Sequence, residues 1–186
     1  MGNGKVFLEI GTCDFDTCLP LAEAGWSGYM IEADPRYAEI MANKTAQYDV
    51  QVDNVAMSDK NGIVSFRQSV SNDDWSRGVG HVDSDSHAGT KLLDIKGNEV
   101  LNHGKIEVSC MTLDSYINEH NIKRIDFLKV DVEGHEINVL AGFNWGIKPT
   151  FIKIEHVHVD IDLLLGPLRE QGYTCWVEER DIYAII

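Results

Sequence analysis

The sequence predicts an α/β fold, Rossmann-like, in which a mostly parallel sheet lies between two layers of helices. Short apolar segments alternate with helical segments along nearly the whole chain, as they do where a crossover helix follows each strand. The segment 125–130 is apolar with little polar interruption, which is typical of a parallel strand buried on both faces. At 186 residues, the chain is expected to form one domain over residues 1–186.

The first part of the chain predicts two strand–helix units followed by further strands. Gly25 is expected to end the first helix. Asp34-Pro35 begins the second, because Asp is a favoured N-cap and Pro suits the first helical position. Asn61-Gly62 signals a tight turn, so the strand after it can pair antiparallel with the third strand. The expected strands are Lys5–Ile10, Ser27–Ile31, Asp49–Met57 and Ile63–Phe66, and the expected helices are Thr17–Ala24 and 34–47.

The segment Gln68–Lys105 differs from its surroundings, because it is rich in Ser, Asp, Gly and His and has only weak periodicity. Loops of this length inside compact domains are usually lids, binding loops or disordered segments. We therefore expect residues 68–105 to be a long insertion loop that acts as a lid or contacts a substrate. Its candidate contacts are Trp75, Arg77, His81 and His87.

The rest of the chain continues the alternation. Thr112 is expected to cap a helix that ends at His120, and Gly142 to stop the helix that follows the central strand. The inward residues of these last helices are expected to be Ile137, Leu140, Ala141, Leu163, Leu164, Leu165 and Leu168. The remaining expected elements are strands at Ile106–Met111 and Thr150–Val157, a helix at Ile161–Gln171, and a closing antiparallel pair, Tyr173–Val177 with Ile182–Ile186.

Composition excludes several classes of function. The net charge of −14, from 30 acidic and 16 basic residues, argues against a nucleic-acid partner. No apolar run approaches the roughly 18 residues that a membrane helix needs, so no membrane association is expected. The N-terminus lacks the apolar stretch of a signal peptide, and the four cysteines show neither a CxxC pair nor zinc spacing. A cytoplasmic protein is therefore expected.

The turns after the first three strands suggest a nucleoside site. Gly11 follows the first strand, but a dinucleotide fingerprint would also need glycines where Cys13 and Asp16 stand, so NAD is disfavoured. Glu32 ends the second strand 21 residues after Gly11, where a carboxylate can accept hydrogen bonds from ribose hydroxyls. The segment 53–56 could supply polar edges to an adenine, although an ordinary loop would look the same. A nucleoside site without phosphates suits S-adenosylmethionine.

The turn after the central strand is unusually acidic. Asp131, Glu133 and Glu136 place three carboxylates within six positions, just beyond the expected carboxyl end of a buried strand. Ligands of open α/β sheets bind at these strand ends, so Asp131 is a candidate site residue. For Glu133 and Glu136, a stabilising interaction with the helix dipole is an alternative explanation.

Several of these motifs together resemble the FkbM-type family of S-adenosylmethionine-dependent methyltransferases. The similarity covers roughly Val6 to Glu155 outside the long loop, and it is most specific in the Lys129-x-Asp131-x-Glu133-Gly134 motif. The motifs that carry it are Glu9-x-Gly11, Glu32-Ala33-Asp34-Pro35, Asn54-Val55-Ala56, Thr112-Leu113-Asp114 and 125–134. The resemblance implies a class I methyltransferase fold, with a seven-stranded, mostly parallel sheet that ends in an antiparallel hairpin, and O-methylation of a small molecule or sugar.

The resemblance also implies roles for individual residues. Asp131 would line the amino-acid end of the cofactor, and Glu133 or His135 would take the proton of an acceptor hydroxyl. The expected cofactor contacts are Glu9, Gly11, Thr12, Cys13, Asp14, Glu32, Ala33, Asp34, Asp53, Asn54, Ala56 and Asp131. The chain departs from the family pattern at two positions: the family usually has Asp where Glu9 stands and a glycine near Phe15.

Three alternatives stay open. His156, His158 and Asp160 alternate along the chain and could share one face, which permits a divalent metal site with Asp131 or Glu155, although no metal is favoured. A noncatalytic adenosyl-binding or interaction protein would keep Gly11 and Glu32 but lose the acceptor pocket. An NAD-dependent reductase would need the missing glycines. The sequence is compatible with a homo-oligomer but does not indicate one.

Overall fold

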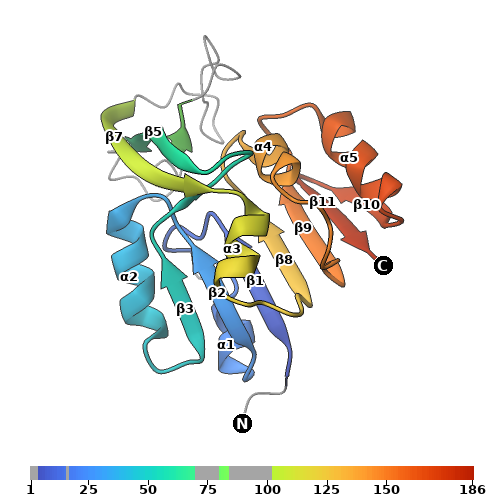
Figure 1. Ribbon diagram of the computed structural model, residues 1–186, viewed down its shortest axis with the longest axis horizontal. Helices are drawn as coiled ribbons and strands as arrows, with labels where there is room; N and C mark the ends of the chain where they lie inside the picture. Colours follow the sequence, from blue (N-terminus) through green and yellow to red (C-terminus); the bar gives the residue numbers. More distant parts are fainter. Residues whose placement is uncertain (1–3, 16, 70–79, 84–101) are drawn as a thin grey trace.

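A seven-stranded sheet with helices on both faces forms the centre of the molecule (Figure 1). The structure is a computed structural model that describes residues 4–15, 17–69, 80–83 and 102–186, with the side chains of 69, 102 and 103 left undescribed. The strand order is β10-β11-β9-β8-β1-β2-β3. The predicted layered α/β fold is therefore confirmed.

The strands of this sheet follow the predicted segments closely. β11 runs antiparallel to its neighbours β9 and β10, which confirms the predicted closing pair, and the other neighbouring strands are parallel. The carboxyl ends of β1, β2, β3, β8 and β9 consequently meet at one edge (Figure 1). The strands are β1 Val6–Ile10, β2 Ser27–Ile31, β3 Val50–Asp53, β8 Phe127–Val130, β9 Phe151–Glu155, β10 Thr174–Glu178 and β11 Asp181–Ile185.

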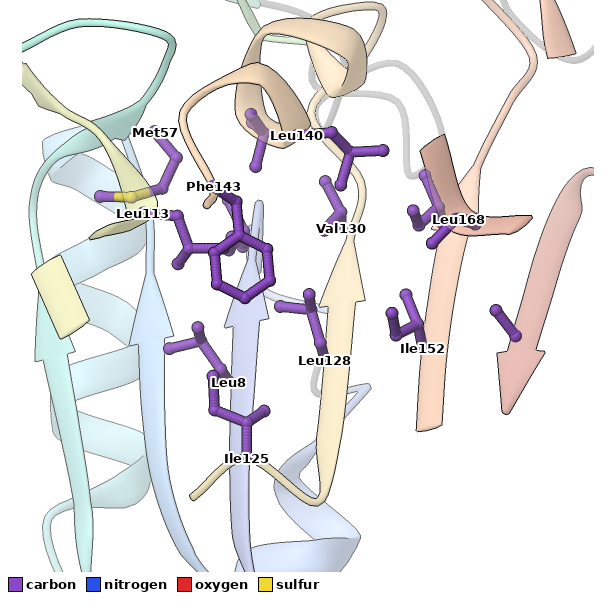
Figure 2. Packing of buried hydrophobic residues seen from close by; sticks show 14 of the residues in the cluster. Leu8, Met57, Leu113, Ile125, Leu128, Val130, Leu140, Phe143, Ile152 and Leu168 are labelled. Carbon is purple, nitrogen blue, oxygen red and sulfur yellow. The ribbon is translucent and has the colours of Figure 1, made fainter. Parts of the chain in front are cut away.

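Five helices are described: α1 Leu19–Glu23, α2 Pro35–Thr45, α3 Leu113–Glu119, α4 Glu136–Ala141 and α5 Ile161–Glu170. The largest core cluster lies between the sheet and α3, α4 and α5, where Leu8 and Leu128 from neighbouring strands meet Leu113, Leu140 and Leu168 from the three helices (Figure 2). A smaller cluster packs beneath α1 and α2. None of the described helices has the length and apolar character that crossing a membrane would require.

Most helix boundaries and caps agree with prediction. The side chains of Asp34 and Thr112 accept hydrogen bonds from the amides of Arg36 and Ser115, respectively, and so cap α2 and α3. α1 is shorter than predicted, because its first helical residue is Leu19. In α4 and α5 the predicted inward positions Ala141 and Leu163 are exposed, which is a correction, and Val139 is buried instead.

Gly142 ends α4 as predicted, but for a different reason. Its φ of −83° is not the left-handed conformation for which a C-terminal glycine is usually selected. A Cβ at this position would instead lie 2.2 Å from the Ser58 carbonyl oxygen. Close packing against the neighbouring loop therefore requires the glycine.

A second, smaller sheet lies over the carboxyl edge of the large one (Figure 1). It has the order β4-β7-β5-β6, with β4 Ala56–Met57, β5 Gly62–Ser69, β6 His81–Val82 and β7 Asn102–Met111. The predicted single strand Asp49–Met57 is therefore wrong, because the chain leaves the large sheet after Asp53 and enters the small one at Ala56. The side chain of Asn54 stabilises this transition by donating to the carbonyls of Glu32 and Ala33.

The predicted pairing after Asn61-Gly62 is also wrong. β5 pairs antiparallel with β7, from Gly62 opposite Cys110 onward, rather than with β3. Parts of the predicted loop Gln68–Lys105 are therefore strand. Of its candidate contacts, His81 is buried in β6, whereas Trp75, Arg77 and His87 lie outside the described residues. The lid function of the segment stays a prediction.

Candidate functional site

A cleft of about 570 Å³ lies where the carboxyl ends of β1, β2 and β8 face the small sheet. This volume includes the solvent-open space at the mouth of the cleft. Apolar residues of both sheets form most of its wall, and three acids face it. The lining residues are Ile10, Gly11, Cys13, Phe15, Ile31, Glu32, Ala33, Val55, Ala56, Met57, Phe66, Gly80, Val82, Asp131, Val132 and Glu133.

Gly11 allows the turns after β1 and β8 to touch. Its φ is +76°, and a Cβ there would lie 1.7 Å from the carbonyl oxygen of Asp131. Its amide donates to the Ile31 carbonyl at 2.9 Å, which fixes the turn against β2 as well. The glycine thus brings the two turns into contact, and its backbone forms part of the cleft wall.

Glu32 holds the first two turns together. Its carboxylate accepts hydrogen bonds from the amides of Cys13 at 2.7 Å and Asp34 at 2.8 Å, and the side chain is almost completely buried. Burial raises the pKa of Glu32 to about 7, although the two amide hydrogen bonds favour the ionised form. A carboxylate has about four acceptor sites, so two remain for a ligand in the cleft.

Next to the cleft residue Asp131 lies a buried ion pair whose lysine belongs to the family motif but was not predicted to be a site residue. Glu9 and Lys129 stand opposite each other in the β1–β8 register, and their charged atoms are 3.3 Å apart. Lys129 Nζ also lies 3.3 Å from Asp131 and donates to the Gly11 carbonyl at 3.2 Å. Burial alone would lower the pKa of Lys129, but the charges of Asp131 and Glu9 outweigh this and raise it.

The sequence contained a signal for this lysine. A charged residue inside an otherwise apolar central strand needs a buried partner of opposite charge. Glu9 is the carboxylate that occupies the matching level of β1. Glu9 itself does not line the cleft, so its role in the structure is to neutralise Lys129.

Only some of the other predicted cofactor residues line the cleft. Cys13, Ala33 and Ala56 line the cleft, whereas Asp34 caps α2 and pairs with Arg36, and Thr12 is fully buried in the first turn. Thr12 and Asp14 are both absent from the cleft wall, although they flank Cys13.

Asp53 and Asn54 also lie outside the cleft lining. Asp53 accepts a hydrogen bond from the Tyr116 hydroxyl at 2.6 Å and lies 3.7 Å from His120. Asn54 shapes the cleft indirectly, through its bonds to the carbonyls of Glu32 and Ala33. The apolar side chains of Val55 and Met57 stand in the wall instead, on either side of Ala56, and the apolar run 55–57 after β3 could have indicated them.

Among the three predicted catalytic residues, Asp131 and Glu133 line the cleft and His135 does not. Glu133 has a φ of +53°, a conformation that non-glycine residues rarely adopt, and burial raises the pKa of its carboxyl group. His135 is buried at the start of α4, with Nε2 3.0 Å from the Ser58 hydroxyl. It is thus part of the packing between α4 and the small-sheet loop.

Glu136 stabilises the acidic turn from within. Its Oε1 accepts hydrogen bonds from the amides of Val132 at 2.9 Å and Gly134 at 3.3 Å. Burial raises the pKa of Glu136 to about 7. Glu136 is the first residue of α4, where the helix-dipole explanation placed it, but its hydrogen bonds are with the preceding turn.

Glu133 also contacts the turn after β9. His158 Nε2 lies 3.0 Å from Glu133 Oε2, and Glu155 stands close to both, so that one ligand atom from each residue lies within 4.8 Å of the other two. His156 and Asp160 do not join this cluster, because the chain turns after Glu155 and Asp160 caps α5. The predicted common face of His156, His158 and Asp160 is therefore wrong.

Comparison with known proteins adds two findings. The family model described as Methyltransferase FkbM domain matches residues 6–175. The fold is similar to the crystal structure of precorrin-6y C5,15-methyltransferase from Geobacter metallireducens GS-15, with a TM-score of 0.52 and 9% identity over 100% of this chain and 80% of that one. At this identity the likeness concerns the fold alone. No curated protein matches the sequence.

Proposed function

The chain belongs to the FkbM methyltransferase domain family, and from this premise we propose that it methylates a hydroxyl group of a small molecule or sugar. The methyl donor implied by the family is S-adenosylmethionine, whose positively charged sulfur carries the transferable methyl group. One observation carries the proposal: an apolar cleft in which the bare backbone of Gly11 and the buried carboxylate of Glu32 stand side by side.

The residues of the cleft fit an adenosyl compound. Glu32 has acceptor capacity left for two ribose hydroxyls, and the side chains of Val55 and Met57 offer apolar surface to a base. Gly11 lets the turns after β1 and β8 touch and lines the cleft with bare backbone. Asp131 is the acid available to the amino group at the other end of the cofactor, and its negative charge also suits a neighbouring sulfonium.

In this proposal the chain contributes alignment and proton transfer. Holding a hydroxyl in line with the methyl group can lower the barrier by up to about 7–11 kcal/mol. Glu133 lines the cleft and has a raised pKa, so its carboxylate is the group proposed to accept the hydroxyl proton. Such general-base assistance typically contributes about 10²–10⁴-fold in rate.

The first experiment is calorimetric titration with S-adenosylhomocysteine. We expect micromolar binding to the wild type, a loss of about 100-fold in Glu32→Ala because charge-assisted hydrogen bonds contribute about 1.5–3 kcal/mol each, and no loss in Asp49→Ala. Asp49 is a suitable control because it is exposed and hydrogen-bonds Ser27, at the amino end of β2.

Two results would contradict the cofactor assignment. One is a folded wild type that does not bind S-adenosylhomocysteine. The other is a wild type whose thermal unfolding temperature is raised more by NAD than by S-adenosylhomocysteine. Mass spectrometry of sugar and small-molecule hydroxyl compounds incubated with the protein and S-adenosylmethionine then tests the acceptor class. An increase of one methylene mass at oxygen is expected. Transfer exclusively to nitrogen or carbon would overturn O-methylation while leaving the cofactor assignment intact.

A further inference from the structure

Three potential metal ligands converge at the end of the cleft, where the turns after β8 and β9 meet. Glu133, Glu155 and His158 each bring one ligand atom to within 4.8 Å of the others, and their side chains are 16%, 13% and 11% exposed. In an octahedral site with bonds of about 2.1 Å, adjacent ligand atoms lie roughly 3.0 Å apart and opposite ones roughly 4.2 Å apart. The 3.0 Å separation of His158 Nε2 and Glu133 Oε2 equals the adjacent-ligand distance, and the whole set needs only a small contraction.

The contact between Glu133 and His158 is compatible with shared coordination. Glu133 Oε2 is buried, and His158 Nε2 lies 3.0 Å from it. This separation fits a hydrogen bond from a protonated imidazole when no cation is bound, and it also fits two adjacent ligands of one cation.

The local charge is also unbalanced. Asp131, Glu133 and Glu155 place three carboxylates near one another at this end of the cleft. Lys129 is already engaged by Glu9 and Asp131, and Arg180 contacts Glu155 at 3.4 Å with nearly half of its side chain exposed. A divalent cation would supply the positive charge that these carboxylates lack.

From this geometry we propose that Glu133, Glu155 and His158 bind a divalent cation of the Mn²⁺ or Mg²⁺ type. Two carboxylates and one imidazole form a ligand set that Mn²⁺ accepts readily, and three protein ligands leave open positions for water and an acceptor oxygen. Because Glu133 lines the cleft, the cation would lie at its border, next to the proposed methyl acceptor.

The role of the cation in catalysis rests on the proposed function, whereas its binding does not. Coordination lowers the pKa of a bound hydroxyl, so that a weak base suffices to remove its proton. Glu133 Oε1 would then take the proton while Oε2 ligates the cation. The acceptor would accordingly need a hydroxyl that can reach the metal and the donor methyl group at once.

Mn²⁺ titration followed by electron paramagnetic resonance tests the site directly, because free and bound Mn²⁺ give different signals. The full chain is titrated with and without saturating S-adenosylhomocysteine. We expect one bound Mn²⁺ per wild-type chain, and binding at least about 100-fold weaker in Glu155→Gln and in His158→Ala, since changes in the outer shell alone cost about 10–100-fold. Glu170→Gln, which removes an exposed carboxylate at the end of α5, is expected to bind as tightly as the wild type.

The outcomes separate this proposal from the proposed function. Wild type that binds S-adenosylhomocysteine but shows no Mn²⁺ site, or a site equally strong in Glu155→Gln and His158→Ala, overturns the cation site and leaves the methyltransferase assignment standing. Unchanged S-adenosylhomocysteine binding by these two variants shows that they are folded. Activity that persists in EDTA would overturn the catalytic role of the cation, whereas loss in EDTA and recovery with Mn²⁺ would support it.

Discussion

Buried charge is neutralised differently in two parts of the carboxyl edge. The first half comprises the turns after β1 and β2, and the second half comprises the turns after β8 and β9. In the turns after β1 and β2, each buried acid has partners within the protein: Glu9 pairs with Lys129, Glu32 accepts two amide hydrogen bonds, and Asp34 caps α2. In the turns after β8 and β9, Glu133 and Glu155 share few compensating groups. The acids of the first half are thus held by backbone amides and a buried lysine, whereas the acids of the second half lie close to one another.

This difference is consistent with a separate function for each half. A half whose acids are already held by the backbone offers a fixed surface, which suits the recognition of one constant molecule such as a cofactor. A half in which carboxylates lie close to one another suits the binding of a cation. The following experiments test whether the two halves respond independently.

The largest loss of stability is expected when Lys129, which contacts acids of both halves, is replaced. Lys129→Met leaves Glu9 buried without its cation, and breaking a buried pair in this way typically destabilises a protein by about 3–5 kcal/mol. Urea unfolding at pH 7 measures the change. In Lys153→Met, at the same level of the neighbouring strand, the lost pair with Asp181 is partly exposed, so we expect about 1 kcal/mol or less. Equal losses in the two variants would contradict the special position of Lys129.

The second-largest loss of stability is expected when the contact between the turns after β1 and β8 is disturbed. Gly11→Ala would force a Cβ against the Asp131 carbonyl and keep a residue with a side chain at positive φ, so we expect a loss of about 2–4 kcal/mol in stability and no measurable S-adenosylhomocysteine binding. Gly25→Ala has a similar φ with nothing within 4 Å of the added Cβ, and about 1 kcal/mol is expected. Thermal unfolding and calorimetry of both variants provide the comparison, and tight binding by Gly11→Ala would place the ligand elsewhere.

A moderate change in S-adenosylhomocysteine affinity is expected when the pH is varied, because Glu32 in the first half titrates near neutral pH. The pKa of Glu32 is raised to about 7, and ribose hydroxyls donate to its ionised form, so affinity must rise as the pH increases through this value. Between pH 6 and pH 8 the ionised fraction grows about tenfold, and S-adenosylhomocysteine should bind about tenfold more tightly at the higher pH. Calorimetry across this range checks the slope. Glu32→Gln should bind weakly with little pH dependence, and a wild type with a flat profile would argue against a ribose contact.

The smallest effect, a change in Mn²⁺ affinity, is expected from replacing Arg180, which contacts Glu155 in the second half. Arg180 contacts Glu155 and competes with the proposed cation, but the arginine is half exposed and such pairs are weak. Arg180→Gln should therefore tighten Mn²⁺ binding only about threefold and leave S-adenosylhomocysteine binding unchanged. Weaker Mn²⁺ binding in this variant would mean that Arg180 positions Glu155 rather than competing for it.

The sequence predicted the large sheet well, because apolar periodicity, the Asp34-Pro35 cap and the closing hairpin are local signals that the packing did not override. It mispredicted the exit from β3, because whether residues 54–57 continue one strand or enter another sheet depends on a partner, β7, that lies about 50 residues away. The family motifs pointed to Gly11, Glu32, Asp131 and Glu133, and all four line the cleft. The partner of Lys129 depends on the β1–β8 register, and the meeting of Glu133 with His158 depends on the turn after β9; local patterns specify neither.

The pairing of Glu9 with Lys129 also bears on how the sheet assembles. These residues are 120 positions apart, yet β1 and β8 must align correctly at the centre of the sheet. A slip of one residue would turn Lys129 toward the apolar layer that holds Leu128 and Val130, or leave Glu9 facing an aliphatic side chain. Each misaligned pairing would bury a lone charge. The ion pair therefore selects one alignment of two distant strands, and with it the relative placement of Gly11 and Asp131 that shapes the cleft.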